Sequence, residues 1–361
     1  MKIVYFQSGS EDFRCGVWFY RQIIPAKALR KRGHEIKMAV LTNRIDEWWY
    51  KFPDVVIFRN VYLFDPVSAM RELKRRGKRI VYDIDDDFWT INPDNPAAKT
   101  AKEKVEQITA LLKEADIVTT TTEVLKQRLS KFNKNIAIVP NALDFTEFCE
   151  RPKNEGLLKV GYTGGASHWG DLEMVANVIG ELQKKYKFKF VLQGITGDPL
   201  INEIYTYRYY LGQGLQPEKN EFYEAAMRTF EKLRRLNYIH IPWYHPELYP
   251  PILVGMDWDI GLCPLKDNSF NQAKSCVKFY EYAAVGTTCL ASDVLPYKNE
   301  VNYRAKNTFK DWYKKLEKLI KDEKFREKIT EKQWEFVEKN RNIEEVILQW
   351  EKILGYVGSQ S

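Results

Sequence analysis

Cysteine is scarce in this sequence, and its spacing fits neither a metal site nor a disulfide framework. The number is odd, and no pair has the close spacing of a zinc knuckle or a redox dithiol. The residues are Cys15, Cys149, Cys263, Cys276 and Cys289. We therefore expect small packed thiols in a reducing compartment, without a disulfide or a structural metal.

Long apolar runs and a strong charge of one sign are also missing. No run approaches the roughly 18 apolar residues of a membrane span, and MKIVYFQSGS turns polar too early for a signal peptide. The 56 Lys and Arg residues exceed the 49 Asp and Glu residues to a net charge of only +7, with both signs interspersed. This pattern indicates a solvated surface and argues against a nucleic-acid partner. We expect a cytoplasmic protein.

The chain is long and apolar enough for two folded domains. Its 361 residues compare with roughly 100–200 residues per domain. Through residues 1–147, β-rich runs alternate with amphipathic helical stretches, which predicts βαβ units and a parallel sheet. Strands are expected at 2–7, 35–41, 54–60, 79–85, 115–122 and 135–141, with helices at 17–32, 66–76 and 96–114 among them.

The alternation restarts after a polar linker at 148–157. The sequence therefore predicts an α/β protein of two Rossmann-like, doubly wound domains, 1–147 and 158–306, that face a cleft. Strands are expected at 158–165, 189–194, 237–242, 259–265 and 287–293, with helices at 168–186 and 274–285. Residues 307–361 have helical spacing, and we expect the last helix to pack back on the N-terminal domain.

An insert at 195–236 interrupts the second domain. It is predicted to be a helical pair, with an acceptor or oligomer contact as the alternative, because clustered exposed aromatic residues often mark interfaces. Its tyrosines include Tyr205, Tyr207, Tyr209 and Tyr210.

A glycine turn joins the first strand and the first helix of the second domain. Ligands of open parallel sheets bind at the carboxyl ends of the strands, and Gly164 and Gly165 lie at such an end. Backbone N–H groups at the following helix start can meet a phosphate there. His168, one turn into the helix, can donate to a bound oxygen. The alternatives are a tight turn that needs the same glycines and a surface histidine.

A second polar group opens the helix predicted at 274–285. Ser275, Lys278 and Glu281 fall at i, i+3 and i+6, with Lys274 beside Ser275. The lysines can neutralise a diphosphate, and Ser275 can hydrogen-bond to it. Glu281 can accept both hydroxyls of a ribose, because a carboxylate offers two acceptor oxygens and no donor. Ordinary salt bridges along a helix are the alternative.

Four carboxylates directly follow the strand predicted at 79–85. Their mutual repulsion is costly unless a cation or the hydroxyls of a ligand arrive. A capped helix start or a solvated turn is the alternative. The cluster, within residues 83–87, consists of Asp83, Asp85, Asp86 and Asp87.

Basic residues and a glycine follow other strands of the first domain. Arg14 and Gly16 follow the first strand, Arg21 lies in its helix, and Arg59 ends the third strand. Together they predict a positive lining at the strand ends, with an acid partner for Arg21 as the alternative.

Two further features suggest peripheral contact of the protein with the inner face of an anionic membrane. One is the basic stretch RELKRRGKR at 71–79, and the other is the pair Trp48 and Trp49. A solvated helix and a packed tryptophan pair are the alternatives.

Four segments carry motifs of a known family. ADIVTTTTEVLKQRL (115–129) precedes NIAIVPNALD (135–144), which reads V-P-N-x-x-D. DIGLCPLKDNSFNQAKS (259–275) leads into KSCVKFYEYAAVGTTCLASD (274–293). With the two-unit layout and the glycine turn, these segments resemble nucleotide-sugar-dependent glycosyltransferases of the GT-B fold, family 4-like.

The resemblance implies roles for individual residues. Glu281 corresponds to the second glutamate of the E-x7-E signature, which binds the donor ribose. Gly164 and Gly165 match the turn by the donor phosphates, and Ser275 and Lys278 fall where the helix start approaches the diphosphate.

The resemblance also places residues near the donor sugar and the acceptor, and the chain departs from the family pattern there. Gly16 matches the family's N-terminal glycine loop, and we expect Arg14, Arg59 and Asn141 on the same side. Ala273 stands where the first glutamate of E-x7-E belongs. The basic pair that follows the first strand of the second domain is replaced at best by His168 and Lys266, and the cluster at 83–87 is not the usual histidine-bearing loop.

The expected activity is transfer of a sugar from a nucleoside diphosphate to an acceptor hydroxyl, with retention and without a metal or cofactor. Lys278 would stabilise the leaving diphosphate, and Asp85 or Asp86 would orient or deprotonate a glycan, lipid-linked or protein acceptor. A magnesium-dependent phosphohydrolase is one alternative, because a strand ending in D-x-D is typical of that class, although Asp87 stands where threonine or valine is expected. A non-catalytic sugar-nucleotide-binding module is the other.

Overall fold

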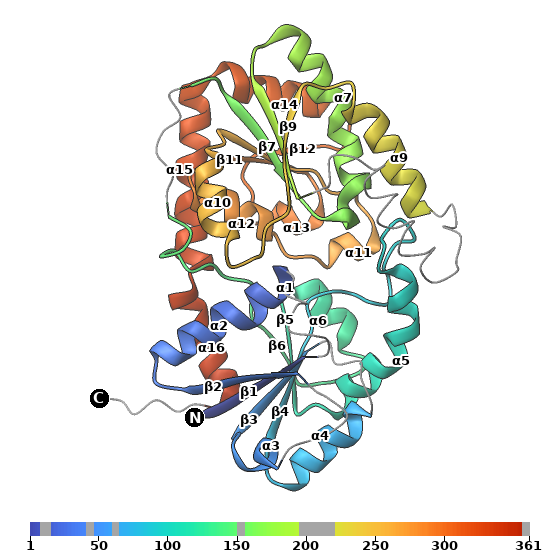
Figure 1. The fold of residues 1–361 in the computed structure, drawn as a ribbon, viewed down its shortest axis with the longest axis vertical. Coiled ribbons are helices and arrows are strands. Elements are labelled where there is room, and N and C mark those ends of the chain that lie inside the picture. Colours follow the sequence, from blue (N-terminus) through green and yellow to red (C-terminus); the bar gives the residue numbers. More distant parts are fainter. Residues whose placement is uncertain (8–15, 41–46, 60–64, 150–155, 195–220, 356–361) are drawn as a thin grey trace.

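The computed structural model describes residues 1–7, 16–40, 47–59, 65–149, 156–194 and 221–355. Over these residues the chain forms two α/β units that lie one above the other along the long axis of the molecule (Figure 1). Each unit is built on a sheet of six parallel strands with helices on both faces. The predicted fold class is confirmed.

The N-terminal sheet has the strand order β2-β1-β3-β4-β5-β6, so its chain order reverses between β1 and β3. Its strands are β1 (Lys2–Gln7), β2 (Glu35–Val40), β3 (Val55–Arg59), β4 (Arg79–Asp83), β5 (Ile117–Thr120) and β6 (Ile136–Ile138). Its longer helices are α2 (Ile24–Lys31), α4 (Pro66–Arg75), α5 (Ala98–Glu114) and α6 (Glu123–Leu129), and α3 (Trp48–Lys51) is a short one.

The C-terminal sheet has the order β12-β11-β10-β7-β8-β9, so its chain order reverses between β7 and β10. Its strands are β7 (Lys159–Thr163), β8 (Lys189–Gln193), β9 (Tyr238–Ile241), β10 (Ile260–Cys263), β11 (Thr288–Ser292) and β12 (Arg304–Ala305). Its helices are α7 (Trp169–Lys185), α9 (Glu221–Leu233), α10 (Tyr249–Met256), α11 (Ser269–Gln272), α12 (Val277–Ala284) and α13 (Leu295–Lys298).

The first predicted helix, 17–32, is not continuous. A single helical turn, α1 (Gly16–Trp18), is followed by a π-helical turn, η1 (Phe19–Ile23), before α2. Pro25 lacks the N–H that a regular α-helix would direct to the carbonyl of Arg21, and the N–H of Ile24 donates to the carbonyl of Phe19, five residues back. The proline therefore accounts for the wider turn.

Short elements and one helix boundary also differ from prediction. The short elements α3, α10, α11, α13 and β12 were not predicted from the sequence. The helix predicted at 274–285 starts only at Val277, because α11 ends at Gln272 and Lys274 lies in the turn between them. Of the insert, residues 221–233 form α9, and 195–220 lie outside the described residues.

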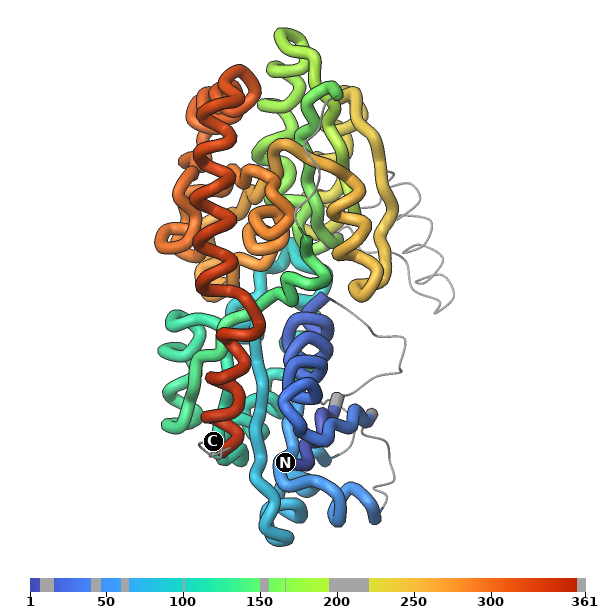
Figure 2. The backbone as a smooth tube through the Cα atoms, turned by 90° about the vertical axis from the view of Figure 1, so that its left-hand side faces the viewer, coloured from blue at the N-terminus to red at the C-terminus, as the bar shows by residue number. Residues whose placement is uncertain are grey.

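The last helix leaves the C-terminal unit and lies along the N-terminal one (Figure 2). The final helices are α14 (Phe309–Lys321), α15 (Glu323–Arg341) and α16 (Ile343–Leu354). Between α15 and α16, the N–H of Leu143 donates to the carbonyl of Arg341 at 2.8 Å, and the N–H of Ile343 donates to the carbonyl of Leu143 at 2.8 Å. These bonds hold the crossing next to the segment that leaves the N-terminal sheet.

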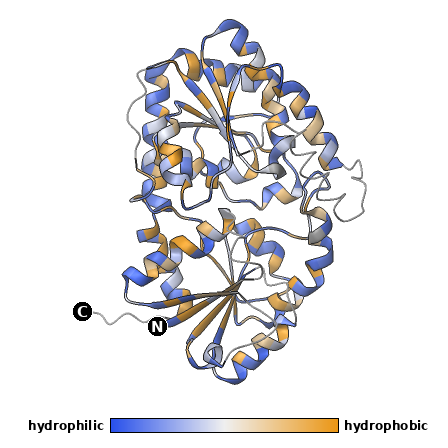
Figure 3. Cartoon of the chain, viewed as in Figure 1, coloured by the Kyte–Doolittle hydropathy of each residue, from blue (hydrophilic) through white to orange (hydrophobic). Residues whose placement is uncertain are grey.

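The strands and the helix faces that cover them are hydrophobic, and the outer faces of the helices are hydrophilic (Figure 3). Every residue of β3 and of β11 is buried, as expected for parallel strands covered on both faces. Cys263, Cys276 and Cys289 are buried free thiols. Cys149 is an exposed free thiol, which corrects the prediction that it is packed. Cys15 lies outside the described residues.

Candidate active site

A cavity of about 350 Å³ lies between the two units, where residues that follow β1 and β4 meet residues that follow β7, β8 and β10. The volume is within the range of small-molecule sites. Both chain-order reversals lie at this edge, as expected for ligand sites of open parallel sheets. The N-terminal unit contributes Gly16, Val17, Tyr20, Asp85, Asp86 and Asn141 to the lining.

Glu281 of α12 is the buried acid of this cavity. Its side chain accepts hydrogen bonds from the hydroxyls of Tyr20 and, at 3.3 Å, of Tyr249. Burial raises the pKa of Glu281 to about 7, although the hydrogen bonds and the charge of Lys278 oppose the rise. A carboxylate with this pKa is poised between its neutral and charged forms near neutral pH.

Two lysines line the same cavity. Lys278, on α12, lies with its Nζ 5.0 Å from the ring centroid of Tyr162, and burial lowers its pKa. Lys274 reaches across to the N-terminal unit, with its Nζ 3.5 Å from Asp86. Both lie near the start of α12, where the helix dipole favours an anion.

Ser275 is bonded to the N-terminal unit. Its hydroxyl accepts a hydrogen bond from the side-chain amide of Asn141 at 2.8 Å, and both residues line the cavity. The V-P-N-x-x-D segment of the N-terminal unit therefore contacts the turn that precedes α12 directly.

The glycine turn after β7 also lines the cavity. The N–H of Gly164 donates to the carbonyl of Gln193 at 3.1 Å, which closes the turn against the end of β8. Gly194 has a φ of 86°, and a Cβ there would lie 2.8 Å from the carbonyl oxygen of Gly164. Gly165, by contrast, has open space at its Cβ position. The turn thus depends on a second glycine position that the sequence analysis did not select.

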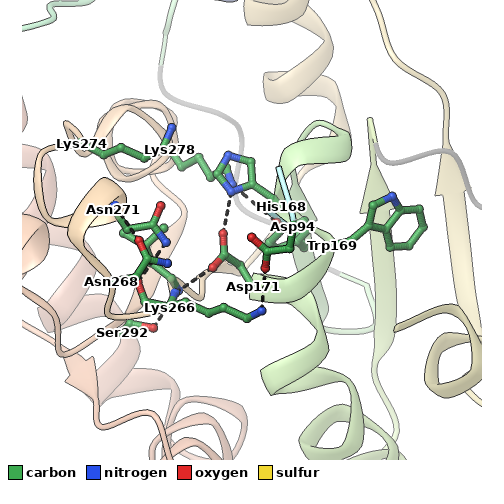
Figure 4. Close-up of polar contacts among 12 residues, drawn as sticks. Asp94, His168, Trp169, Asp171, Lys266, Asn268, Asn271, Lys274, Lys278 and Ser292 are labelled. Atoms are coloured by element: carbon green, nitrogen blue, oxygen red, sulfur yellow. Dashed lines mark hydrogen bonds and ion pairs between the residues drawn. The ribbon is translucent and has the colours of Figure 1, made fainter. Parts of the chain in front are cut away.

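His168 ends a short 3-10 turn before α7, and its imidazole faces both the cavity and Asp171 (Figure 4). Its Nδ1 lies 2.7 Å from a carboxylate oxygen of Asp171. Burial and the charge of Lys278 lower the pKa of His168 to about 4, and outweigh the opposite effect of Asp171. A neutral imidazole that donates from Nδ1 leaves Nε2 as an acceptor, so His168 suits a ligand hydroxyl.

Asp171 also holds the loop that follows β10 (Figure 4). Its second oxygen accepts from the N–H of Lys266 at 2.7 Å. The ammonium group of Lys266 points away from the cavity's lysines and pairs with Asp94 of the N-terminal unit at 2.9 Å. Lys266 therefore forms a contact between the units.

Each carboxylate of the acidic cluster has a basic partner. Asp83 pairs with Arg21 at 2.5 Å and Arg59 at 3.3 Å, and Asp85 pairs with Arg59 at 2.7 Å. Asp86 faces Lys274. The fourth member, Asp87, pairs with Arg128 at 2.6 Å and accepts from Thr90 at 2.8 Å. The repulsion that the sequence suggested is thus balanced by basic side chains of the chain itself.

Asp85 and Asp86 are the members of the cluster that reach the cavity. Burial raises the pKa of Asp85, with help from Asp86 and Asp83, although Arg59 opposes the rise. A carboxyl with a raised pKa next to a cavity is suited to exchange a proton with a bound hydroxyl.

Comparison with solved structures identifies the architecture. An α-glucosyltransferase (AGT) in complex with UDP is 13% identical, with 98% of this chain and 99% of that chain covered and a TM-score of 0.64. A trehalose-6-phosphate synthase, OtsA, is 12% identical, with 99% and 100% covered and a TM-score of 0.65. The chain has the GT-B fold. No protein-family model matches the sequence, and the comparison with curated proteins finds no match.

Within the GT-B fold, the predicted site residues divide into three groups. The cavity brings together most of them, namely Gly16, Asp85, Asp86, Asn141, Gly164, Gly165, His168, Ser275, Lys278 and Glu281. Arg59, like Arg21, is buried in ion pairs, so these arginines do not form the predicted positive lining. The lysines of α12 and its preceding turn line the cavity instead. Arg14 lies outside the described residues.

Position 273 has a packing role in this GT-B chain. Ala273 is buried in the hydrophobic core of the N-terminal unit, and its carbonyl accepts a hydrogen bond from Thr122 at 2.8 Å. A glutamate there would bring a carboxylate into that core, which explains why alanine fits the contact.

Residues of both features considered for membrane contact have partners within the N-terminal unit. Trp49 is buried against Phe6, with ring centroids 4.5 Å apart. In the basic stretch, Arg71 and Lys74 pair with acids at the end of α5 and just after it. Among the described residues, no helix has the length and apolar character needed to cross a bilayer.

Several cavity residues were not predicted from the sequence. Gln193 ends β8 and Trp243 follows β9, so the strand-end criterion that selected Gly164 would have found them. Trp243 is 58% exposed at the cavity. Tyr20 and Tyr249 lie within helices, and no local pattern distinguishes them from core tyrosines.

Proposed function

We propose that this protein is a glycosyltransferase that moves a sugar, a hexose in the first instance, from a nucleoside diphosphate to an acceptor hydroxyl. The observation that carries the proposal is that Glu281, Lys274 and Lys278 line one cavity between two Rossmann-like units. A carboxylate suits a vicinal diol, and two ammonium groups near a helix start suit a diphosphate. Structural neighbours in complex with UDP and with UDP-2-fluoro glucose support the same ligand class. The narrower resemblance to family 4 stays a prediction.

The C-terminal unit would hold the donor and the N-terminal unit the acceptor. Glu281 would bind the pentose, and Lys278 with Ser275 would bind the diphosphate. Gly164 and Gly165 would let the backbone of the turn approach the phosphates. His168 would accept a hydrogen bond from a sugar hydroxyl through Nε2.

In the transfer, the bond between the anomeric carbon and the diphosphate oxygen breaks, and its electron pair stays on the phosphate. Lys274 and Lys278 would stabilise that charge, so the proposal includes no resident metal or cofactor. The acceptor oxygen bonds to the anomeric carbon, and its proton passes to Asp85, to Asp86 or, with retention, to the leaving phosphate. A structural neighbour, trehalose-6-phosphate synthase, is described as an enzyme of glycosyltransfer with retention, which supports that outcome.

The acceptor is proposed as a hydroxyl of a glycan, a lipid-linked sugar or a protein. One structural neighbour is an α-glucosyltransferase in complex with UDP and a 13-mer DNA. The expectation that this chain has no nucleic-acid partner therefore stays a prediction, which a DNA-binding assay at low salt tests.

The alternatives have less support. A phosphohydrolase needs carboxylates free to hold magnesium, whereas Asp83 pairs with the buried Arg21 and Arg59, and Asp85 pairs with Arg59 as well. A non-catalytic binding module differs from an enzyme in turnover alone, so both binding and turnover are measured.

A panel of nucleotide sugars, screened by thermal shift, tests the proposal, because a ligand that binds the native state raises its melting temperature. Glu281→Ala should remove most of the shift, and the wild type should release nucleoside diphosphate from the same donor with a chelator present. Absence of any shift from uridine, guanosine and adenosine diphosphate sugars would refute the proposal. Phosphate release from simple esters with magnesium would favour the hydrolase.

A further inference from the structure

We infer that Tyr20 determines how strongly the donor site selects a pentose diol, because its hydroxyl competes with the diol for the carboxylate of Glu281. The inference rests on the proposed function, in which Glu281 binds the donor pentose. It adds a residue of the N-terminal unit to a subsite built on the C-terminal unit.

The hydrogen bond between Tyr20 and Glu281 joins the two units inside the cavity. The residues are 261 positions apart, and both line the cavity. Tyr20 is 7% exposed and Glu281 is 6% exposed, so little of either side chain is open to solvent. The phenol donates to Oε1, while Tyr249 donates to Oε2 at 3.3 Å.

The competition follows from the geometry of a carboxylate. A diol binds it most favourably when one hydroxyl donates to each oxygen. In this structure each oxygen already has a tyrosine donor, and burial leaves little room for further partners. A hydrogen bond to an ionised acceptor is stronger than one between neutral groups, so the tyrosine hydroxyls compete effectively. A hydroxyl of the diol can donate to Oε1 of Glu281 only when the hydrogen bond from Tyr20 to that oxygen is broken.

The backbone around Tyr20 explains how this side chain comes to face the cavity. Tyr20 lies in the π-helical turn ahead of Pro25. Such turns are rare in proteins overall, and those that occur are often found at functional sites. The next residue, Arg21, is anchored in the opposite direction by Asp83 and by the carbonyl of Val139, at 2.7 Å. The wide turn therefore directs Arg21 into the N-terminal core and Tyr20 to the other unit.

The two tyrosines differ in what their release requires. Tyr249 begins α10 and belongs to the same unit as Glu281. Tyr20 belongs to the N-terminal unit, so exchange of its hydroxyl for the diol changes a contact between the units. Pentose binding is thereby coupled to the position of the N-terminal unit.

Calorimetric titration of wild type, Tyr20→Phe and the matched control Tyr249→Phe tests the inference. The ligands are UDP and 2′,3′-dideoxy-UDP, which keeps the base and the diphosphate but has no diol; the GDP and ADP pairs are run in parallel. Tyr20→Phe should bind UDP about tenfold more tightly, as expected for loss of one competing hydrogen bond, and should leave the dideoxy ligand within about twofold. Tyr249→Phe should change the ratio of the two affinities by less than about threefold, because its bond is longer.

The other outcomes distinguish failure of the inference from failure of the proposed function. An equal change for both ligands, or weaker UDP binding, in Tyr20→Phe overturns the inference, since a merely structural effect does not depend on the diol. A diol preference in wild type that Tyr20→Phe leaves unchanged overturns the inference and leaves the proposed function standing. Failure of all three nucleoside diphosphates to bind refutes the proposed function and the inference together. Adding Glu281→Gln to Tyr20→Phe should abolish the gain, and Tyr20→Leu should reproduce it.

Discussion

Nucleotide binding by this protein should follow the ionisation of Glu281. Burial raises the pKa of this carboxyl to about 7, against the effects of the Tyr20 hydrogen bond and the Lys278 charge. The ionised form accepts both hydroxyls of a pentose, whereas the protonated form offers a donor in place of one acceptor. Affinity for a nucleoside diphosphate should therefore fall as the pH falls below about 7.

The size of the effect follows from Glu281→Gln, which keeps the shape and removes the charge. A hydrogen bond to a charged group contributes about 1.5–3 kcal/mol, so UDP binding at pH 8 should weaken by roughly 10- to 150-fold. At pH 6, only about one tenth of a carboxyl with a pKa of about 7 is ionised. The advantage of wild type over the variant should then be about tenfold smaller.

Isothermal titration calorimetry at pH 6, 7 and 8 measures this advantage as the ratio of the two affinities. The ratio cancels the titration of the ligand phosphate, which is common to both proteins. His168, with its pKa lowered to about 4, stays neutral across the range. A ratio that is constant with pH, or close to one at pH 8, would refute the reasoning that Glu281 binds the pentose as a carboxylate.

Other substitutions test the packing and the charges around the cavity. Asp83→Ala should lower the free energy of unfolding by about 3–5 kcal/mol in urea titrations, because it leaves Arg21 and Arg59 buried without that partner; a change below about 1 kcal/mol would contradict this. Lys278→Ala should reduce kcat by about 100-fold in a donor-turnover assay, and Lys278→Arg should retain more activity, because the positive charge is kept. Gly194→Ala should cost about 1–3 kcal/mol in thermal unfolding, because alanine is strained at its φ of 86°; an unchanged melting temperature would count against a tight turn there.

Part of the candidate site was predictable because strand ends can be read locally. Gly164 follows a β-rich run, and Glu281 lies at helical spacing from Lys278, so both could be selected without knowledge of the fold. Trp243 follows β9 and could have been selected by the same criterion. Tyr20 could not, since its direction depends on a π-helical turn that the hydrophobic period does not reveal.

The acidic cluster shows where local reasoning stops. Its composition indicated that positive charge must arrive, and this is what the structure contains. The source of that charge was not readable, because Arg59 is 26 residues from Asp85, and Lys274 is 188 residues from Asp86. Ala273 could not be explained from the sequence either. It is an uncharged residue of the C-terminal unit that is buried in the hydrophobic core of the N-terminal unit.

The amino-acid sequence alone determined the two doubly wound units, because alternation of β-rich and helical runs is a local property set by side-chain burial on each element. It also determined which polar residues follow the strands. Only the tertiary structure decided which of these residues share a cavity, and which acids and bases neutralise one another. Those choices depend on how two separately formed sheets meet, and contacts between segments hundreds of residues apart leave no trace in local periodicity.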